Sequence, residues 1–196
     1  AKIFLSGGSP YSQLNCIYPP LYMALISLPL TVCDHAIGIY IVYSIFVPIT
    51  VYLSVKLASK ILKNKTQVFA FSLTMVILPI FWKGIDRNFN SLIVSGYLLS
   101  LLLFIYSYEK IKIKDNIKAK KALAVAGFAV GTVAAIRFPV LVPFLATCII
   151  FPNIPPKLKF YSFLICAITF GIINAMYYFL FGWDVIYCSY LWSAEQ

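Results

Sequence analysis

The sequence has few charged residues, and acidic residues are the rarer kind. Charged side chains make up 11% of the 196 residues, with six Asp and Glu against sixteen Lys and Arg, whereas a soluble domain carries roughly a quarter. Apolar residues reach 62%, and the mean hydropathy is +0.90. These values exclude a water-soluble domain. They predict an integral membrane protein that crosses the bilayer several times.

Signatures of soluble enzymes are also lacking. The chain has one histidine, His35, and it has neither a phosphate-cradling glycine loop nor a nucleophile elbow. Its five cysteines show no metal-ligand spacing, and we interpret them as small core residues; they are Cys16, Cys33, Cys148, Cys166 and Cys188. We interpret His35 as a turn residue and predict no metal site.

In place of soluble-enzyme motifs, the sequence has long apolar runs. A full span needs about 20 residues, with roughly 17 as a lower limit. The first run could cross the membrane or lie along its surface; because it has only 16 residues and three prolines, we predict an interfacial helix. The other six runs predict transmembrane helices. The runs are Ile17–Val32, Ala36–Val55, Gln67–Trp82, Ser91–Tyr108, Ala122–Ile136, Val140–Phe151 and Phe160–Phe181.

The predicted fold is therefore all-α, a polytopic membrane bundle of about six transmembrane helices plus one interfacial helix. We expect a single membrane domain over residues 1–196, with an outer loop at 1–35, the bundle at 36–182 and an outer segment at 183–196. Because the chain starts with Ala and has no signal peptide, we expect it to be a fragment of a longer protein.

Lysines gather in three short bridges between the apolar runs, at 56–65, 110–121 and 157–159, which hold twelve of the sixteen cations. The net charge of +10 would suggest a nucleic-acid partner in a soluble chain. Here positive-inside topology explains it, so we predict three cytoplasmic bridges and no nucleic-acid partner. We interpret the longest bridge, Lys110–Lys121, as a solvated loop, with contact to anionic lipid headgroups as the alternative.

The stretch "IRFP", Ile136–Pro139, divides thirty apolar residues that are too many for one span. A proline break beside an arginine predicts two short tilted helices that meet at the outer surface. Arg137 at this break either snorkels to the interface or meets an anionic headgroup, which suits its planar fork. Both interpretations stay open.

A second polar stretch, "WKGIDRNFNS", Trp82–Ser91, separates two apolar runs on the same side. It is either an ordinary hydrated loop or a place where Asp86, Lys83 and Arg87 lie near a lipid phosphate. We predict that Asp86, Arg87 and Arg137 converge on one outer pocket that faces Tyr11–Tyr18, because buried cations near hydrocarbon need a compensating anion.

The opening, "AKIFLSGGSPYSQLNCIYPPLYMALISLPL", resembles the region after the first transmembrane helix of GT-C glycosyltransferases that use polyprenyl-phosphate sugars. It is most similar to the polyprenol-phosphate-mannose mannosyltransferases. "GIDRNFNSLIVSGYLLSLLLFIY" and "ALAVAGFAVGTVAAIRFPVLVPFLA" resemble later parts of these proteins in the same order. Together the three stretches cover roughly residues 1–146.

The resemblance implies a GT-C-like fold whose sugar-transfer site lies on the outer or lumenal face. It implies transfer of a sugar, with mannose as the first choice, from a polyprenyl-phosphate donor. Asp86 is then the candidate catalytic acid, and the substrate-binding candidates are Tyr11, Tyr18, Lys83, Arg87, Asn90 and Arg137. The cofactor is left unknown, with a divalent cation open, and membrane lipid is an expected partner.

One difference from the family limits what the resemblance implies about catalysis. The family places its catalytic Asp after helix one, whereas this chain has no acid before Asp34. Either those residues belong to a longer parent chain, or the protein is a non-catalytic membrane subunit that associates with partner subunits. The membrane itself could be a bacterial or archaeal cell membrane or the endoplasmic reticulum.

Overall fold

The computed structural model describes residues 6, 8–9, 19–32, 44–62, 64–77, 90–151 and 153–191. Within these ranges every regular element is helical, which confirms the predicted all-α class. Three helices are long and apolar enough to cross a membrane: α8 (Asn90–Lys112), α9 (Asn116–Ile136) and α11 (Pro156–Phe181). The chain is thus an α-helical membrane protein.

Four helices of 10 to 16 residues accompany them: α3 (Pro20–Val32), α5 (Phe46–Ile61), α6 (Lys65–Ile77) and α10 (Leu141–Ile150). Even α5, the longest of the four with 16 residues, would rise only about 24 Å, against about 30 Å of hydrocarbon. The predicted spans Ala36–Val55, Gln67–Trp82 and Val140–Phe151 correspond to α5, α6 and α10, with residues 36–43 and 78–82 outside the described ranges.

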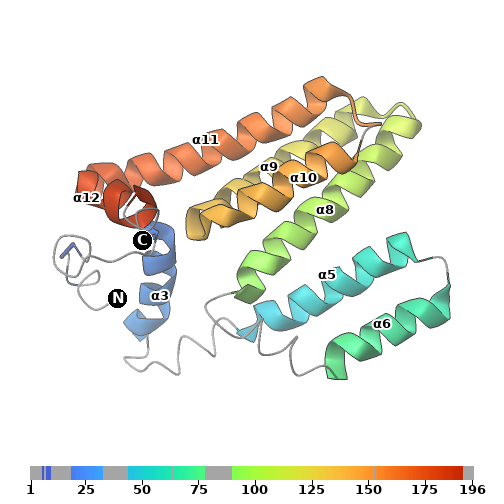
Figure 1. Cartoon of the computed structure of the whole chain (residues 1–196), viewed down its shortest axis with the longest axis horizontal. Helices are drawn as coiled ribbons and strands as arrows, with labels where there is room; N and C mark the ends of the chain where they lie inside the picture. The colour runs from blue at the N-terminus through green and yellow to red at the C-terminus, as the bar shows by residue number, and fades with distance from the viewer. Residues whose placement is uncertain are drawn as a thin grey trace.

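Helix α9 is the centre of the bundle and packs mainly against α8 and α11 (Figure 1). Gly127 and Gly131 let the backbones of α9 and α11 approach closely, since a Cβ on Gly131 would lie 2.6 Å from the carbonyl oxygen of Cys166. The Ser162 hydroxyl donates to the Leu123 carbonyl at 2.8 Å across the same interface. Small residues and one interhelical hydrogen bond therefore hold this pair together.

Helix α8 is joined to its neighbours by polar contacts. The Thr50 hydroxyl of α5 bonds the Ser91 carbonyl at 2.9 Å. On the other side, the Tyr97 hydroxyl lies 2.9 Å from the Thr147 hydroxyl of α10 and donates to the Pro143 carbonyl at 3.0 Å. Inside hydrocarbon such groups must find partners within the protein, so these bonds fix the positions of α5 and α10 along α8.

The lysine-rich tract 110–121 is mostly helical, which corrects the predicted solvated loop. Helix α8 continues through Lys112, and α9 begins at Asn116, so only residues 113–115 form the turn. Asp115 is the N-cap of α9, and its side chain accepts from the Lys118 backbone N–H at 3.1 Å. Lysine is a good helix former and aspartate a good cap, so local preferences extend both helices into the tract.

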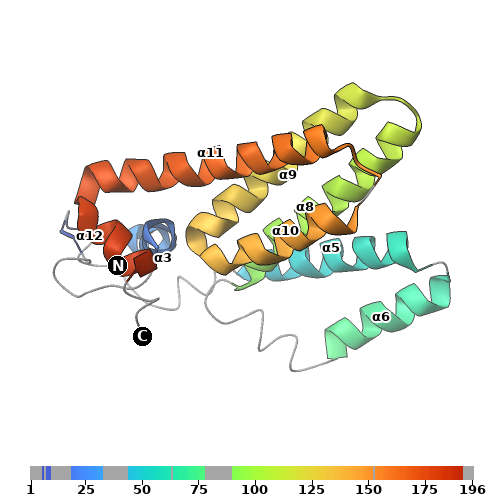
Figure 2. The ribbon, with the colours of Figure 1, turned by 45° about the horizontal axis from the view of Figure 1, so that its top comes forward.

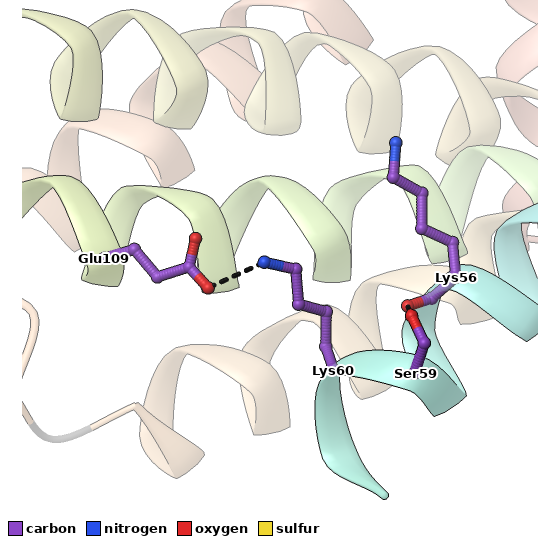
Figure 3. A network of polar contacts seen from close by, with 4 residues as sticks. All are labelled: Lys56, Ser59, Lys60 and Glu109. Carbon is purple, nitrogen blue, oxygen red and sulfur yellow. Dashed lines mark hydrogen bonds and ion pairs between the residues drawn. The ribbon is translucent and has the colours of Figure 1, made fainter. Parts of the chain in front are cut away.

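The turns that carry the three lysine bridges lie at one end of the bundle, here called the basic end (Figure 1). Lys60 of α5 and Glu109 of α8 form an ion pair of 2.8 Å there, while the neighbouring Lys56 points away from this carboxylate (Figure 3). Asn153, before α11, bonds the Tyr108 hydroxyl of α8 at 3.5 Å. The described residues of the three bridges thus lie at the same end of the bundle, as a common side requires, and their cytoplasmic location stays a prediction.

Helix α3 lies at the other end, here called the Arg137 end. Figures 1 and 2 show its axis running crosswise to α9 and α11, and its 13 residues are too few to span a bilayer. Both features agree with the predicted interfacial helix, although residues 17 and 18 of that prediction lie outside the described ranges. Crosswise placement is a tertiary feature that composition did not require.

Candidate functional site

The candidate site begins where α9 stops at Ile136. Pro139 has no N–H, and its ring would clash with the carbonyl four residues earlier, which favours a helix end before it. Arg137 is extended, with φ −151° and ψ 97°, and a 3-10 turn at Phe138–Val140 leads into α10. The predicted break at Ile136–Pro139 is confirmed, but only α10 is short, because α9 has 21 residues and is long enough to span.

Burial changes abruptly at this break. Val133, Ala134, Ala135 and Ile136 are buried, whereas the next three residues, starting with Arg137, are exposed. The guanidinium therefore stands at the end of a buried apolar helix. A planar fork of N–H donors in that place is suited to bind a phosphate or carboxylate bidentately.

An apolar cluster surrounds the base of the Arg137 end. Tyr22 and Met23 of α3 pack there with residues of five other elements, including α12 (Trp183–Ile186) and the π-helical turn η2 (Tyr187–Leu191). The remaining buried members are Ile93, Val133, Ile136, Tyr177, Val185 and Cys188. This cluster brings the opening helix, the start of α8 and the end of α9 to one place.

Of the predicted site residues, only Arg137 and Asn90 belong to the described ranges. Asn90 is the first residue of α8, and Ile93 in the next turn packs with Ile136, so the start of α8 and Arg137 share one end. Tyr11, Tyr18, Lys83, Asp86 and Arg87 lie outside the described residues. The predicted convergence of Asp86, Arg87 and Arg137 therefore stays a prediction.

A carboxylate that the sequence-based prediction did not select also lies at this end. Asp184 is exposed in α12, directly before the fully buried Val185 of the apolar cluster. Gly182, with φ 73°, ends α11 and turns the chain toward α12. The signal was available, because Asp184 follows the last apolar run on the side that the lysine count assigns to the outer face.

Charge is sparse at this end within the described ranges, where Arg137 and Asp184 are its only ionisable cation and acid. Across the described residues, no three His, Cys, Asp or Glu side chains are grouped so as to hold a metal ion. Three of the cysteines, Cys148, Cys166 and Cys188, are free thiols that are partly or fully buried, as expected of core residues.

Comparisons with protein families, with curated proteins and with solved structures found no match for the chain.

Proposed function

We propose that the chain is all or part of a GT-C-type membrane glycosyltransferase that takes a sugar, mannose in the first instance, from a polyprenyl phosphate. The observation that carries the proposal is Arg137, exposed at the break between two apolar helices and beside a crosswise helix. A polyprenyl chain could lie along the apolar helices while its phosphate meets the guanidinium. The proposal places this end on the outer or lumenal face.

The proposed fold has six spans, with α5, α6 and α10 completed by flanking residues, and α3 as an interfacial helix over the site. The segment before α8, with Lys83, Asp86 and Arg87, would join Arg137, because α8 begins at the Arg137 end. Tyr11, Tyr18 and Asn90 would line the acceptor side. The bacterial or archaeal cell membrane and the endoplasmic reticulum both fit this arrangement.

Sugar transfer with inversion needs a carboxylate that removes a proton from the acceptor hydroxyl as it attacks the anomeric carbon. The phosphate leaves with negative charge, so cations beside it lower the barrier. In this proposal Arg137 stabilises the leaving phosphate. Asp86 stays the candidate catalytic acid, and Asp184 adds a carboxylate at the Arg137 end of the described bundle; either could take the part of the base, which the family places after helix one and which is not visible in this sequence.

Donor binding by the full chain in lipid nanodiscs tests the proposal, with a polyprenyl phosphate sugar as the ligand. Loss of a charge-assisted hydrogen bond corresponds to about 1.5–3 kcal/mol, so Arg137→Ala should weaken binding about tenfold to a hundredfold. Arg137→Lys should retain part of the affinity, because it keeps the positive charge but lacks the planar guanidinium. Lys114→Ala, at the basic end, is the matched control and should bind the donor with unchanged affinity.

Equal donor affinity in Arg137→Ala and in the unmodified chain would refute the proposed site. Transfer of labelled sugar to an acceptor then separates the two functional classes. If the donor binds and Asp86→Asn or Asp184→Asn stops transfer, the chain is catalytic. If the donor binds and the unmodified chain transfers nothing, the alternative of a non-catalytic membrane subunit is favoured.

A further inference from the structure

The basic end holds far more cations than the protein neutralises. Its described part has eleven lysines and two acids. Both acids are engaged, Glu109 with Lys60 at 2.8 Å and Asp115 with Lys118 at 3.2 Å. Nine lysines are left without an ion pair to any described carboxylate: Lys56, Lys65, Lys110, Lys112, Lys114, Lys120, Lys121, Lys157 and Lys159. Counter-charge for this surface must come from outside the described chain.

Tyrosine rings lie directly beneath several of these ammonium groups. The Lys112 Nζ is 4.3 Å from the ring centroid of Tyr108, and the Lys120 Nζ of α9 is 4.8 Å from that of Tyr161 on α11. Lys110 and Lys56 lie over Tyr106 and Tyr52 at 5.1 and 5.5 Å. Tyrosine is enriched at the level of lipid headgroups, with lysine reaching just beyond it. These pairs therefore mark the depth at which headgroups meet the bundle.

Two isoleucines at the tip of the α8–α9 turn distinguish lipid from other anionic partners. Ile113 in the turn and Ile117 in the first turn of α9 are 67% and 72% exposed, although each has lysine neighbours in sequence. Water or a nucleic acid backbone offers such side chains no apolar contact. The boundary between headgroups and acyl chains accepts both apolar side chains and cations.

We propose that the α8–α9 and α10–α11 turns form a binding surface for anionic phospholipid headgroups, defined by Lys112, Lys120, Lys157, Lys159, Ile113 and Ile117. The lipid phosphates would bind the lysines, and the isoleucines would insert among the headgroups beside them. The acyl chains would lie along exposed apolar side chains of α11 such as Phe160, which is 65% exposed, and Leu164. This site is at the opposite end from Arg137 and is independent of the proposed sugar transfer.

Lipid retention by the purified full chain in detergent tests this surface. Native mass spectrometry would compare bound phosphatidylglycerol with phosphatidylcholine of the same acyl chains. We expect at least a tenfold preference for phosphatidylglycerol. Each lysine near a headgroup surface contributes about fivefold, so Lys112→Gln/Lys120→Gln/Lys159→Gln should remove the preference. High salt should weaken it in the unmodified chain, because the sites are exposed.

Three further measurements make the result decisive. Lys65→Gln, on α6 away from both turns, is the control and should leave the preference for phosphatidylglycerol nearly unchanged. Ile113→Asn/Ile117→Asn should reduce retention of both lipids, because the apolar insertion is lost. Glycerol phosphate, which has the headgroup charge without acyl chains, should compete poorly. Equal retention of the two lipids by the unmodified chain, an unchanged preference in the triple variant, or full competition by glycerol phosphate would each overturn the proposal.

Discussion

The two ends of the bundle differ in what surrounds their apolar cores. At the basic end, a buried cluster that includes Leu123 and Ile154 is overlaid by surface polar contacts, such as the Lys60–Glu109 ion pair and the Asp115 cap, while many lysines face outward. At the Arg137 end, the described elements meet in a buried apolar cluster that includes Tyr22, Met23 and Ile136, with very few charges.

This difference shows how one chain can fit two unlike surroundings. Exposed ion pairs are worth little, with a median of about 0–1 kcal/mol, so the surface contacts of the basic end add little to its buried cluster. The Arg137 end has few surface charges, and packing fixes α3 crosswise against the bundle. We therefore expect the exposed lysines of the basic end to tolerate substitution and the buried residues of both clusters to be sensitive to it.

The largest expected effect is an all-or-none difference in accessibility between the ends. Lys114→Cys at the basic end and Trp183→Cys in α12 are both exposed positions. In sealed cells, an impermeant thiol reagent should label Trp183→Cys and leave Lys114→Cys unmodified, because positive bridges face the cytoplasm. Labelling is read as a gel shift against the unmodified chain, which reports the background from native cysteines. Labelling of Lys114→Cys from outside would reverse the assigned orientation.

The next effect concerns α9, the helix that connects the two ends. Gly131→Ala should destabilise the chain by about 1–3 kcal/mol, because the new methyl overpacks the interface; its Cβ would lie 2.6 Å from the Cys166 carbonyl oxygen of α11. Gly127→Ala should act similarly, since its Cβ would collide with the Ser162 carbonyl oxygen. Thermal unfolding in detergent, followed by helicity, measures both.

Gly171 is the matched control, because a Cβ there meets nothing within 4 Å. Gly171→Ala should be neutral or slightly stabilising, as alanine has the higher helix propensity. Equal unfolding midpoints for Gly131→Ala and Gly171→Ala would contradict the close α9–α11 contact.

The smallest expected effect is a pH dependence at the basic end. The Lys118 backbone N–H that donates to Asp115 lowers the pKa of this carboxyl below its ordinary 3.8, and the Lys118 side chain adds to the effect. A lowered folded pKa means that the ionised group stabilises the fold above pH 3.8 and that this contribution is lost as the pH falls through the folded pKa.

Asp115→Ala should therefore unfold at a slightly lower temperature than the unmodified chain near pH 7, and the difference should narrow in acid. Asp115→Asn keeps a capping side chain without the charge, so near pH 7 its unfolding temperature should fall by less than that of Asp115→Ala. If the difference in unfolding temperature between Asp115→Ala and the unmodified chain stayed constant from pH 7 to pH 3, the charge of the carboxylate would not be the cause of the difference.

Much of the local structure could be predicted because local chemistry decides it. The end of α9 at Ile136 is favoured by Pro139, which lacks the N–H that a continuing helix would use and disfavours helical geometry before it. The predicted loop at Lys110–Lys121 is wrong because the helix propensity of lysine and the cap at Asp115 outweigh the high charge of the tract. Asp184 can be found from the sequence only when its position after the last apolar run is combined with the outer side that the lysine count assigns.

The membrane class, the all-helical fold, the break at Arg137 and the gathering of lysines into three bridges can all be read from the amino-acid sequence. Composition and backbone chemistry act residue by residue, so these features need no knowledge of distant contacts. The crosswise position of α3, the contact of Gly127 and Gly131 with α11, and the position of Lys120 over Tyr161 arise from packing between distant parts of the chain. In an apolar chain nearly every helix face is hydrophobic, so periodicity cannot select partners, and close packing between particular side chains makes the choice.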